Sequence, residues 1–374
     1  MPVVDELGTS VEGKERTLLR RAAAALRSNR ARTAHRLFSE VLETAGDSAA
    51  RAEALAGLGH VAHRSGRPRE AVRLFEDSLH LFGQEVDERP DLAEPLGRAY
   101  AAVGELERAS LVFDRCLRRA RGDGDATAQV RFASLLSYAL TDRGEFEQAE
   151  QALAEVLSAS EGVADPSVRA RIEWAQARLR GEQGQTEVAL RHARAVLELL
   201  EPTQHTQFLA LTYELLASLS NDLGRPEEAQ ALLRDGWPLM ISSATPLQVA
   251  HYRIEEARAL AALGQHEGAA AVAMRVAAQL DGTHPGDAGR AYVLLGEIFD
   301  RLGDVPRARQ LYETGIGLLS RQGASRYLAD AYRRLAELFE AEYRTEDAVA
   351  VLKRALAVQA RVRPTFAVAA ERPV

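Results

Sequence analysis

Apolar and polar positions alternate along the chain with the periodicity of an α-helix, and turn residues interrupt this periodicity at nearly constant intervals. Each turn residue is followed five positions later by an alanine, as Gly66 is by Ala71 and Gly144 by Ala149. Successive turns lie 37 to 40 residues apart. The pattern predicts nine consecutive pairs of helices, each pair joined by a tight turn. The turns are expected near positions 29, 66, 104, 144, 184, 224, 264, 303 and 343.

The first and last copies of the pattern lack the glycine. Asn29 and Tyr343 stand at their turns, and asparagine tolerates a left-handed backbone better than tyrosine does. Helix-breaking residues such as Asp165 and Pro166 separate the copies, and Pro68 falls in the first turn of a predicted second helix.

A small residue stands seven positions before every turn. We expect it to face the alanine of the same copy, so that two antiparallel helices can cross closely. Larger apolar residues, such as Leu58 eight before a turn and Phe75 nine after it, then fill the space around this crossing. The small residues are Ala22, Gly59, Gly97, Ser137, Ala177, Ala217, Ala257, Gly296 and Ala336.

This spacing of small residue, turn residue and alanine resembles the tetratricopeptide repeat, over residues 15–361. The period near 40 exceeds the usual 34 and is similar to the sensor arrays of bacterial helix-turn-helix regulators. The resemblance implies an all-α fold, a right-handed α-solenoid of nine helical hairpins whose first helices line a concave groove. Residues 1–14 are expected to be a disordered N-terminal segment, too short for the regulators' DNA-binding domain, and residues 362–374 a C-terminal tail.

The resemblance also implies which side chains face the groove, because the family's groove positions lie 13, 10, 6, 3 and 2 residues before the turn. Guanidinium groups suit carboxylates and aromatic rings offer an apolar plate, so the ligand is expected to be a peptide that is acidic or has a free C-terminus. The candidate peptide-binding residues are Arg98, Arg131, Tyr138, Arg171, Trp174, Arg178, Asn221, His251, Arg258 and Arg290.

Two alternatives remain open for this surface. Arginine is so abundant that several of these positions would hold it in an ordinary solvated face. Trp174 could instead be a core residue, because Ile172, Ala175 and Leu179 surround it in the sequence. Copies five and seven also depart from the core pattern, with Gln176 and Glu256 at the usual leucine position and Glu173 and Arg253 three residues earlier.

The formal net charge of -7 argues against a whole-protein electrostatic grip on nucleic acid. Residues 14–36 nevertheless hold eight basic residues and one acidic residue, a local charge of +7. We interpret this stretch as a charged N-terminal cap of the array, with contact to an acidic partner or nucleic acid as the alternative. Without a signal-peptide pattern or a membrane-spanning apolar stretch, the chain is expected to be cytoplasmic, and the single Cys116 to be a core residue.

The sequence contains no strong motif for catalysis or for metal binding. His60 and His63 lie three apart without a third ligand at a motif spacing, and no phosphate loop or nucleophile elbow is present. We therefore expect no metal, no cofactor and no enzyme activity. The sequence predicts a peptide- or protein-binding scaffold, with a peptide-sensing regulator as the alternative and an enzyme as a weaker one. The apolar face of the last hairpin, with Val349 and Leu352, predicts cover by the tail or by a second subunit in a homodimer.

Overall fold

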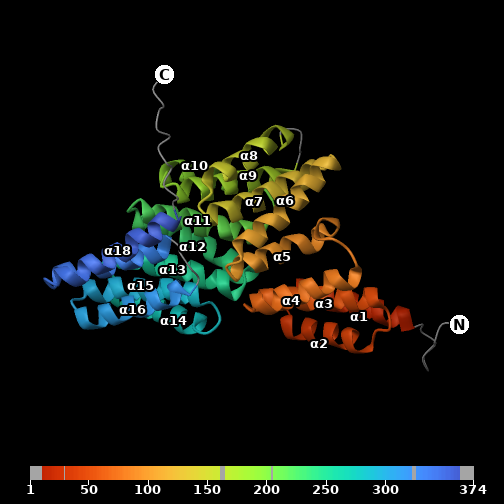
Figure 1. The fold of residues 1–374 in the computed structure, drawn as a ribbon, viewed down its shortest axis with the longest axis horizontal. Helices are drawn as coiled ribbons and strands as arrows, with labels where there is room; N and C mark the ends of the chain where they lie inside the picture. Colours follow the sequence, from red (N-terminus) through yellow and green to blue (C-terminus); the bar gives the residue numbers. More distant parts are fainter. Residues whose placement is uncertain (1–10, 29, 161–164, 204, 322–325, 363–374) are drawn as a thin grey trace, which may run out of the picture. The chain divides into compact units, whose positions relative to one another are not determined.

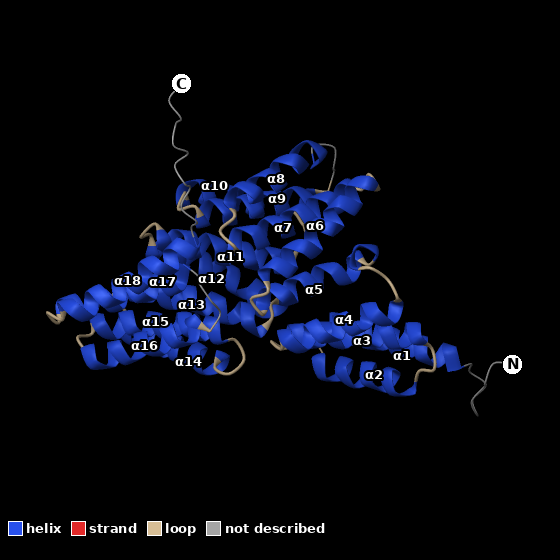
Figure 2. Cartoon of the chain, in the orientation of Figure 1, coloured by secondary structure: helices blue, strands red, loops and turns tan. Residues whose placement is uncertain are grey.

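The computed structural model is helical throughout the residues it describes, which are 11–28, 30–160, 165–203, 205–321 and 326–362. Within these ranges there are eighteen α-helices, the short 3₁₀ helix Val86–Glu88, and no strand (Figures 1 and 2). The all-α fold of paired helices predicted from the sequence is confirmed. Of the predicted N-terminal segment 1–14, residues 1–10 lie outside the described residues, whereas residues 11–14 are helical and differ from the prediction. Of the predicted tail 362–374, residue 362 ends the last helix and residues 363–374 lie outside the described residues.

The helices alternate as first and second members of hairpins. The first helices are α1 Val11–Arg27, α3 Ser48–Arg64, α5 Pro90–Ala102, α7 Ala126–Asp142, α9 Pro166–Glu182, α11 Thr206–Asp222, α13 Pro246–Ala262, α15 Pro285–Arg301 and α17 Arg326–Ala341. The second helices are α2 Ala31–Thr44, α4 Pro68–Phe82, α6 Leu106–Gly122, α8 Phe146–Ser160, α10 Thr186–Leu200, α12 Pro226–Ser243, α14 His266–Leu280, α16 Val305–Ser320 and α18 Thr345–Val362.

The turns within the hairpins are left-handed, which explains their glycines. The seven predicted glycine turns have φ between 68° at Gly224 and 87° at Gly104, a region that residues with a Cβ atom rarely adopt. Tyr343 also has a positive φ, of 61°, so it makes the same turn without the advantage of glycine. Left-handed residues therefore stand at eight of the nine expected turn positions, and Asn29 lies outside the described residues.

The small residues make the core of each hairpin, although their contacts differ from the expectation. All nine alanines that follow the turns are at most 1% exposed. The glycines before the turns lie closest to a ring rather than to these alanines: a Cβ at Gly97 would lie 2.4 Å from Phe113, and one at Gly296 would lie 2.7 Å from Tyr312. The small residue therefore makes room for the aromatic side chain nine positions after the turn.

The chain divides into two compact units. Unit 1 comprises Met1–Leu140 and Gln148–Ala175, and unit 2 comprises Thr141–Glu147 and Gln176–Val374. In unit 1 the apolar side chains of α1 to α4 form one core cluster, and in unit 2 those of α13 to α18 form another. The boundary inside α9 falls at Gln176, where the sequence pattern has lost its leucine.

Local signals fix where several helices begin. Pro68 and Pro226 start α4 and α12, as expected, because the first turn of a helix does not need the N–H that proline lacks. At the start of α13, Thr245 and Gln248 form a reciprocal capping box: each side chain accepts a hydrogen bond from the other's backbone N–H. This cap sets the register of a helix that carries much of the candidate site.

Cys116 lies in α6 and is 2% exposed, which confirms it as a core residue. Burial raises the pKa of its thiol to about 12. Among the described residues, the helices are all too short or too polar to cross a membrane.

Candidate binding groove

The first helices of unit 2 line a cavity of about 310 Å³. Its walls come mainly from α11, α13, α15 and α17, the helices that the sequence assigns to the groove side. The lining residues are Ser218, Asn221, Asp222, Ile254, Arg258, Ala261, Ala262, Arg290, Val293, Leu294, Glu297, Ile298, Arg301, Leu319, Tyr327, Asp330 and Arg334. Of the predicted groove residues, Asn221, Arg258 and Arg290 line this cavity.

The cavity combines apolar and charged walls. Ile254, Val293 and Leu294 supply aliphatic side chains from two neighbouring first helices. In the same cavity the guanidinium of Arg290 lies 4.2 Å from the ring centre of Tyr327, a cation–π contact. Such a wall accepts an apolar side chain, while the charged groups around it hold polar atoms.

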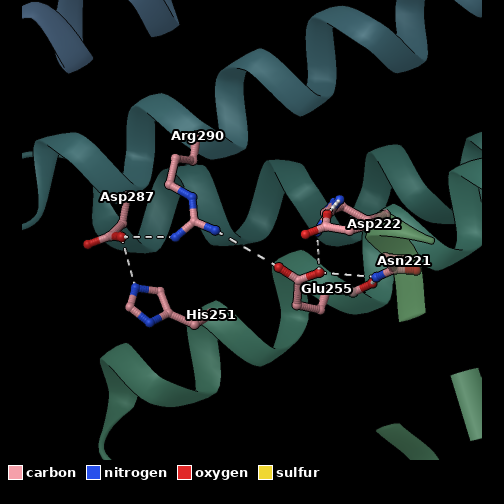
Figure 3. Close-up of polar contacts among 7 residues, drawn as sticks. Asn221, Asp222, His251, Glu255, Asp287 and Arg290 are labelled. Atoms are coloured by element: carbon pink, nitrogen blue, oxygen red, sulfur yellow. Dashed lines mark hydrogen bonds and ion pairs between the residues drawn. The ribbon is translucent and has the colours of Figure 1, made fainter. Parts of the chain in front are cut away.

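The charged side is organised around Glu255, which is 3% exposed (Figure 3). Its carboxylate lies 2.7 Å from Arg258 and 3.9 Å from Arg290, and the amide of Asn221 donates to it at 3.1 Å. Burial would raise the pKa of Glu255, but the charges of Arg258 and Arg290 and the bond from Asn221 lower it. Glu255 is therefore ionised and holds three side chains from three helices.

Two further carboxylates extend the network. Asp222 lies 2.6 Å from Arg258, and Asp287 lies 3.8 Å from Arg290 and 2.8 Å from Nε2 of His251 (Figure 3). Burial would lower the pKa of His251, but its bond to Asp287 and the charge of that carboxylate raise it. Arg258 and Arg290 are thus already paired with carboxylates of the groove itself.

Glu214 on α11 faces the same network. Its side chain is half-buried, and burial together with the charge of Glu255 raises its pKa to about 7, against the opposing effect of His251 and Arg290. A carboxyl with this pKa changes charge close to neutral pH.

The remaining predicted groove residues lie on first helices. In unit 1, Arg98 is bonded to Glu94 at 3.0 Å, and Arg131, Tyr138, Arg171 and Trp174 are all half-buried. In unit 2, Arg178 lies 2.9 Å from Asp142. The structure thus joins Asn221, His251, Arg258 and Arg290 of unit 2 in one network of hydrogen bonds and ion pairs. The predicted groove residues of unit 1 have contacts of their own, such as that of Arg98 with Glu94.

The sequence left open whether Trp174 is a groove residue or a core residue. Ile172, Ala175 and Leu179 are at most 3% exposed and form the core side of α9, whereas Trp174 retains part of its exposure. Its assignment to the groove stays a prediction.

Arg253 and Glu256 are the residues of copy seven that depart from the core pattern, and the side chains of both lie between α12 and α13. Arg253 stacks on the ring of Trp237 at 3.9 Å and pairs with Glu256 at 2.5 Å. Both side chains line a second cavity of about 490 Å³, bounded by residues of α12 and α13. The charged residues at core positions therefore belong to the packing between consecutive repeats.

Sequence reasoning missed Glu255, Asp287 and Tyr327. Glu255 stands nine positions before its turn, where six other copies hold Gly57, Pro95, Leu135, Ala175, Leu215 and Leu294, and the first and last copies hold Arg20 and Arg334. As the only acidic residue at this position of the nine copies, it was a usable signal. Asp287 contacts His251, and Tyr327 contacts Arg290, across repeats, and no spacing along the chain marks these two contacts.

Comparison with protein families agrees with this geometry. The family model described as tetratricopeptide repeat matches residues 54–81 and 96–127, which include parts of α3 to α6. The chain carries tetratricopeptide repeats. Their sequence match covers two stretches of unit 1, and the turns and hairpins of the array continue the same pattern to Tyr343. No curated protein matches the sequence.

Solved structures of other repeat arrays resemble this one. The apo quorum sensor NprR from B. thuringiensis has 14% identity and a TM-score of 0.53, with 94% of this chain and 89% of that chain covered. NprR in complex with its cognate peptide NprX has 14% identity and a TM-score of 0.56, covering 71% and 78% of the two chains. A Rap protein complexed with Competence and Sporulation Factor has 12% identity and a TM-score of 0.52, covering 93% and 98%. At these identities the likeness concerns the fold.

Proposed function

We propose that this repeat array is a non-catalytic peptide-binding protein and that the ligand binds in the groove of unit 2. The cavity formed by four first helices, with aliphatic walls beside an ordered charged network, is the observation that carries the proposal. NprR and the Rap protein, which share the fold, were solved with a peptide and with Competence and Sporulation Factor, and this supports a peptide as the ligand class.

The network suits a peptide because its polar groups are held in place before the ligand arrives. Arg258 and Arg290 keep 32% and 23% of their side-chain exposure while bonded to carboxylates. Fixed donors of this kind bind backbone carbonyls at a low entropic cost. Ile254, Val293 and Leu294 then receive an apolar side chain of the same peptide.

The proposal also covers the chemistry of the ligand, the compartment in which the protein acts and its need for cofactors. The ligand is a peptide with an acidic group or a free C-terminus, the protein acts in the cytoplasm, and it needs no metal or cofactor. The formal net charge of -7 makes nucleic acid an unfavourable partner.

A peptide-sensing regulator is the second candidate, favoured by the division of the chain into two compact units. A sensor changes its dimensions when the peptide binds, and solution scattering with and without a bound peptide measures this. Unchanged dimensions favour the scaffold over the sensor.

A selection from a random library of 12-residue displayed peptides tests the proposed function. We expect enriched peptides whose synthetic forms bind the wild type, and we expect Ala262→Trp to weaken binding at least about tenfold because its ring fills the exposed mouth of the cavity. Ile241→Trp is the matched control, since Ile241 lies on α12, is 60% exposed and does not line the cavity. Equal weakening by both substitutions, or no enriched peptide, contradicts the proposal.

A further inference from the structure

The turn ends of the first two hairpins of unit 1 carry a concentrated positive charge. Hairpin one comprises α1 and α2, and hairpin two comprises α3 and α4. The Nη1 of Arg64, at the end of α3, donates a hydrogen bond at 2.9 Å to the carbonyl of Leu26, at the end of α1, so the two turn ends lie side by side. The arginines at these ends, which we call the basic edge, are Arg27, Arg30, Arg32, Arg64, Arg67 and Arg69.

The basic edge contains little compensating negative charge. In the stretches 26–32 and 63–70 the one acidic residue is Glu70, which pairs with Arg67 at 2.7 Å. Six guanidinium groups and one carboxylate leave a net charge of +5. Four of the arginines are exposed and, in the part of the chain that the structure describes, have no carboxylate within ion-pair distance: Arg27, Arg30, Arg32 and Arg69.

Two of these arginines occupy a position at which other hairpins hold an acidic residue. Arg32 and Arg69 stand three residues after the turn, and six of the seven other copies have Glu107, Glu147, Glu187, Glu227, Glu267 and Glu346 there. The position lies in the first turn of the second helix, where the helix dipole favours a negative side chain over a positive one. Helix stability therefore does not explain these two arginines, and a polar cap of the array would be equally soluble with glutamate.

The next hairpin of unit 1 limits the length of the basic edge. Its turn end carries Glu105 and Glu107, and its Arg108 already pairs with Glu105 at 2.9 Å and with Glu76 of α4 at 2.5 Å. Packed helices lie about 8–10 Å apart, and exposed charges act over about 8 Å at physiological ionic strength. A long polyanion such as a DNA duplex that follows the edge therefore meets negative charge at the third hairpin. A short acidic segment fits within the first two.

We infer that the basic edge docks an acidic segment of a partner protein, at a site separate from the peptide groove of unit 2. Carboxylates of Asp and Glu side chains pair with the exposed guanidinium groups, whose planar N–H donors match them. One exposed ion pair contributes little, so the docking depends on several pairs formed together, and the edge offers four arginines for this. The hydrogen bond from Arg64 to Leu26 fixes the spacing of the two hairpins that carry them.

A fluorescein-labelled deca-glutamate peptide is the probe, and its fluorescence anisotropy with the full chain measures binding. We expect the wild type to bind it at low ionic strength and Arg32→Glu/Arg69→Glu to weaken binding at least about tenfold. The fold should be retained, because six other hairpins hold glutamate at this position. Arg191→Glu/Arg275→Glu is the matched control, with the same change of charge at exposed arginines on second helices of unit 2, and should bind like the wild type.

Two further measurements make the result decisive. A labelled short DNA duplex tests nucleic acid as the partner, and we expect it to bind more weakly than the peptide. Peptides selected for the unit 2 groove should bind Arg32→Glu/Arg69→Glu as tightly as the wild type, so failure of the basic edge leaves the proposed function standing. If the charge reversal lowers the helix content, Arg32→Gln/Arg69→Gln replaces it and should weaken deca-glutamate binding in the same direction. Absence of deca-glutamate binding, equal weakening by the control, or tighter binding of the duplex overturns the inference.

Discussion

The buried carboxylate of Glu255 lies 2.7 Å from the guanidinium of Arg258, one turn further along α13. The same carboxylate also faces Arg290 from α15 and Asn221 from α11. Three repeats are thereby joined through one acidic side chain on the groove side. The ion pairs with Glu255 hold Arg258 and Arg290 in fixed positions from which they can contact a ligand.

Removing this carboxylate should destabilise unit 2. Glu255→Ala leaves Arg258 and Arg290 without their shared acceptor, and breaking a buried ion pair costs about 3 kcal/mol. Urea unfolding followed by the fluorescence of Trp237, with Trp174 changed to Phe, measures this within unit 2. The exposed Glu340→Ala is the control and should change the free energy of unfolding by less than about 0.5 kcal/mol. Equal effects of the two changes would refute the structural role of Glu255.

The stability of unit 2 should depend on pH through Glu214. Its pKa is raised from 4.5 to about 7 in the folded chain, so the folded state binds the proton more tightly and loses stability as pH rises from about 4.5 to 7. The amide in Glu214→Gln cannot ionise beside Glu255. We therefore expect this variant to be more stable than wild type at pH 8, by about 2 kcal/mol, with a smaller difference at pH 5.

The charged groups that face Glu214 are His251, Glu255, Arg290 and Arg178. Denaturant titrations at both pH values, with the exposed Glu267→Gln as control, check the prediction. His251 contributes in the same direction, because its raised pKa gives stability that is lost as pH rises through it. A difference between variant and wild type that is the same at pH 5 and pH 8 would show that Glu214 has an ordinary pKa.

The glycine before a turn should be intolerant of a methyl group. In Gly296→Ala the new Cβ would lie 2.7 Å from the ring of Tyr312, which is 2% exposed and cannot move away. Overpacking of this kind costs about 1–3 kcal/mol. Gly317→Ala, on the following helix with open space around its Cβ, should be neutral or stabilise by about 0.5 kcal/mol. Thermal unfolding of the two variants compares them, and an equally tolerated Gly296→Ala would disprove the close contact.

The last hairpin should mediate self-association. Leu356 and Val349 are 64% and 45% exposed and lie seven residues apart on one face of α18. Sedimentation equilibrium of the wild type should show a dimer at high concentration, and Leu356→Glu should shift it to a monomer because a buried unpaired charge is unfavourable. A wild type that remains monomeric at every concentration would contradict the predicted homodimer.

Much of the fold was predictable because its signals are local. The left-handed turns need glycine or a tolerated substitute, and the alanines five positions later have no room for a larger side chain, so both leave a fixed register in the sequence. The side-chain contacts inside each hairpin were less predictable. The rings of Phe113 and Tyr312 occupy the space in front of the glycines, and no spacing distinguishes this from the expected contact with alanine.

The candidate site was predictable only in part. The groove positions identified Asn221, Arg258 and Arg290, because the helical period places them on one face. Glu255 and Asp287 pair with Arg258 and Arg290 within their own helices. The contacts of Asp222 with Arg258 and of Glu255 with Arg290 cross between repeats. Charge alone could not show that Arg258 and Arg290 are neutralised, because part of their pairing depends on the distances between helices.

Site-specific photo-crosslinking tests the central claim most directly. A benzophenone amino acid at position 262, on the rim of the unit 2 cavity, should crosslink a selected peptide, whereas the same group at the exposed position 241 of α12 should not. An excess of unlabelled peptide should abolish the crosslink at 262. Crosslinks of equal yield from both positions, or from 241 alone, would contradict peptide binding in the groove of unit 2.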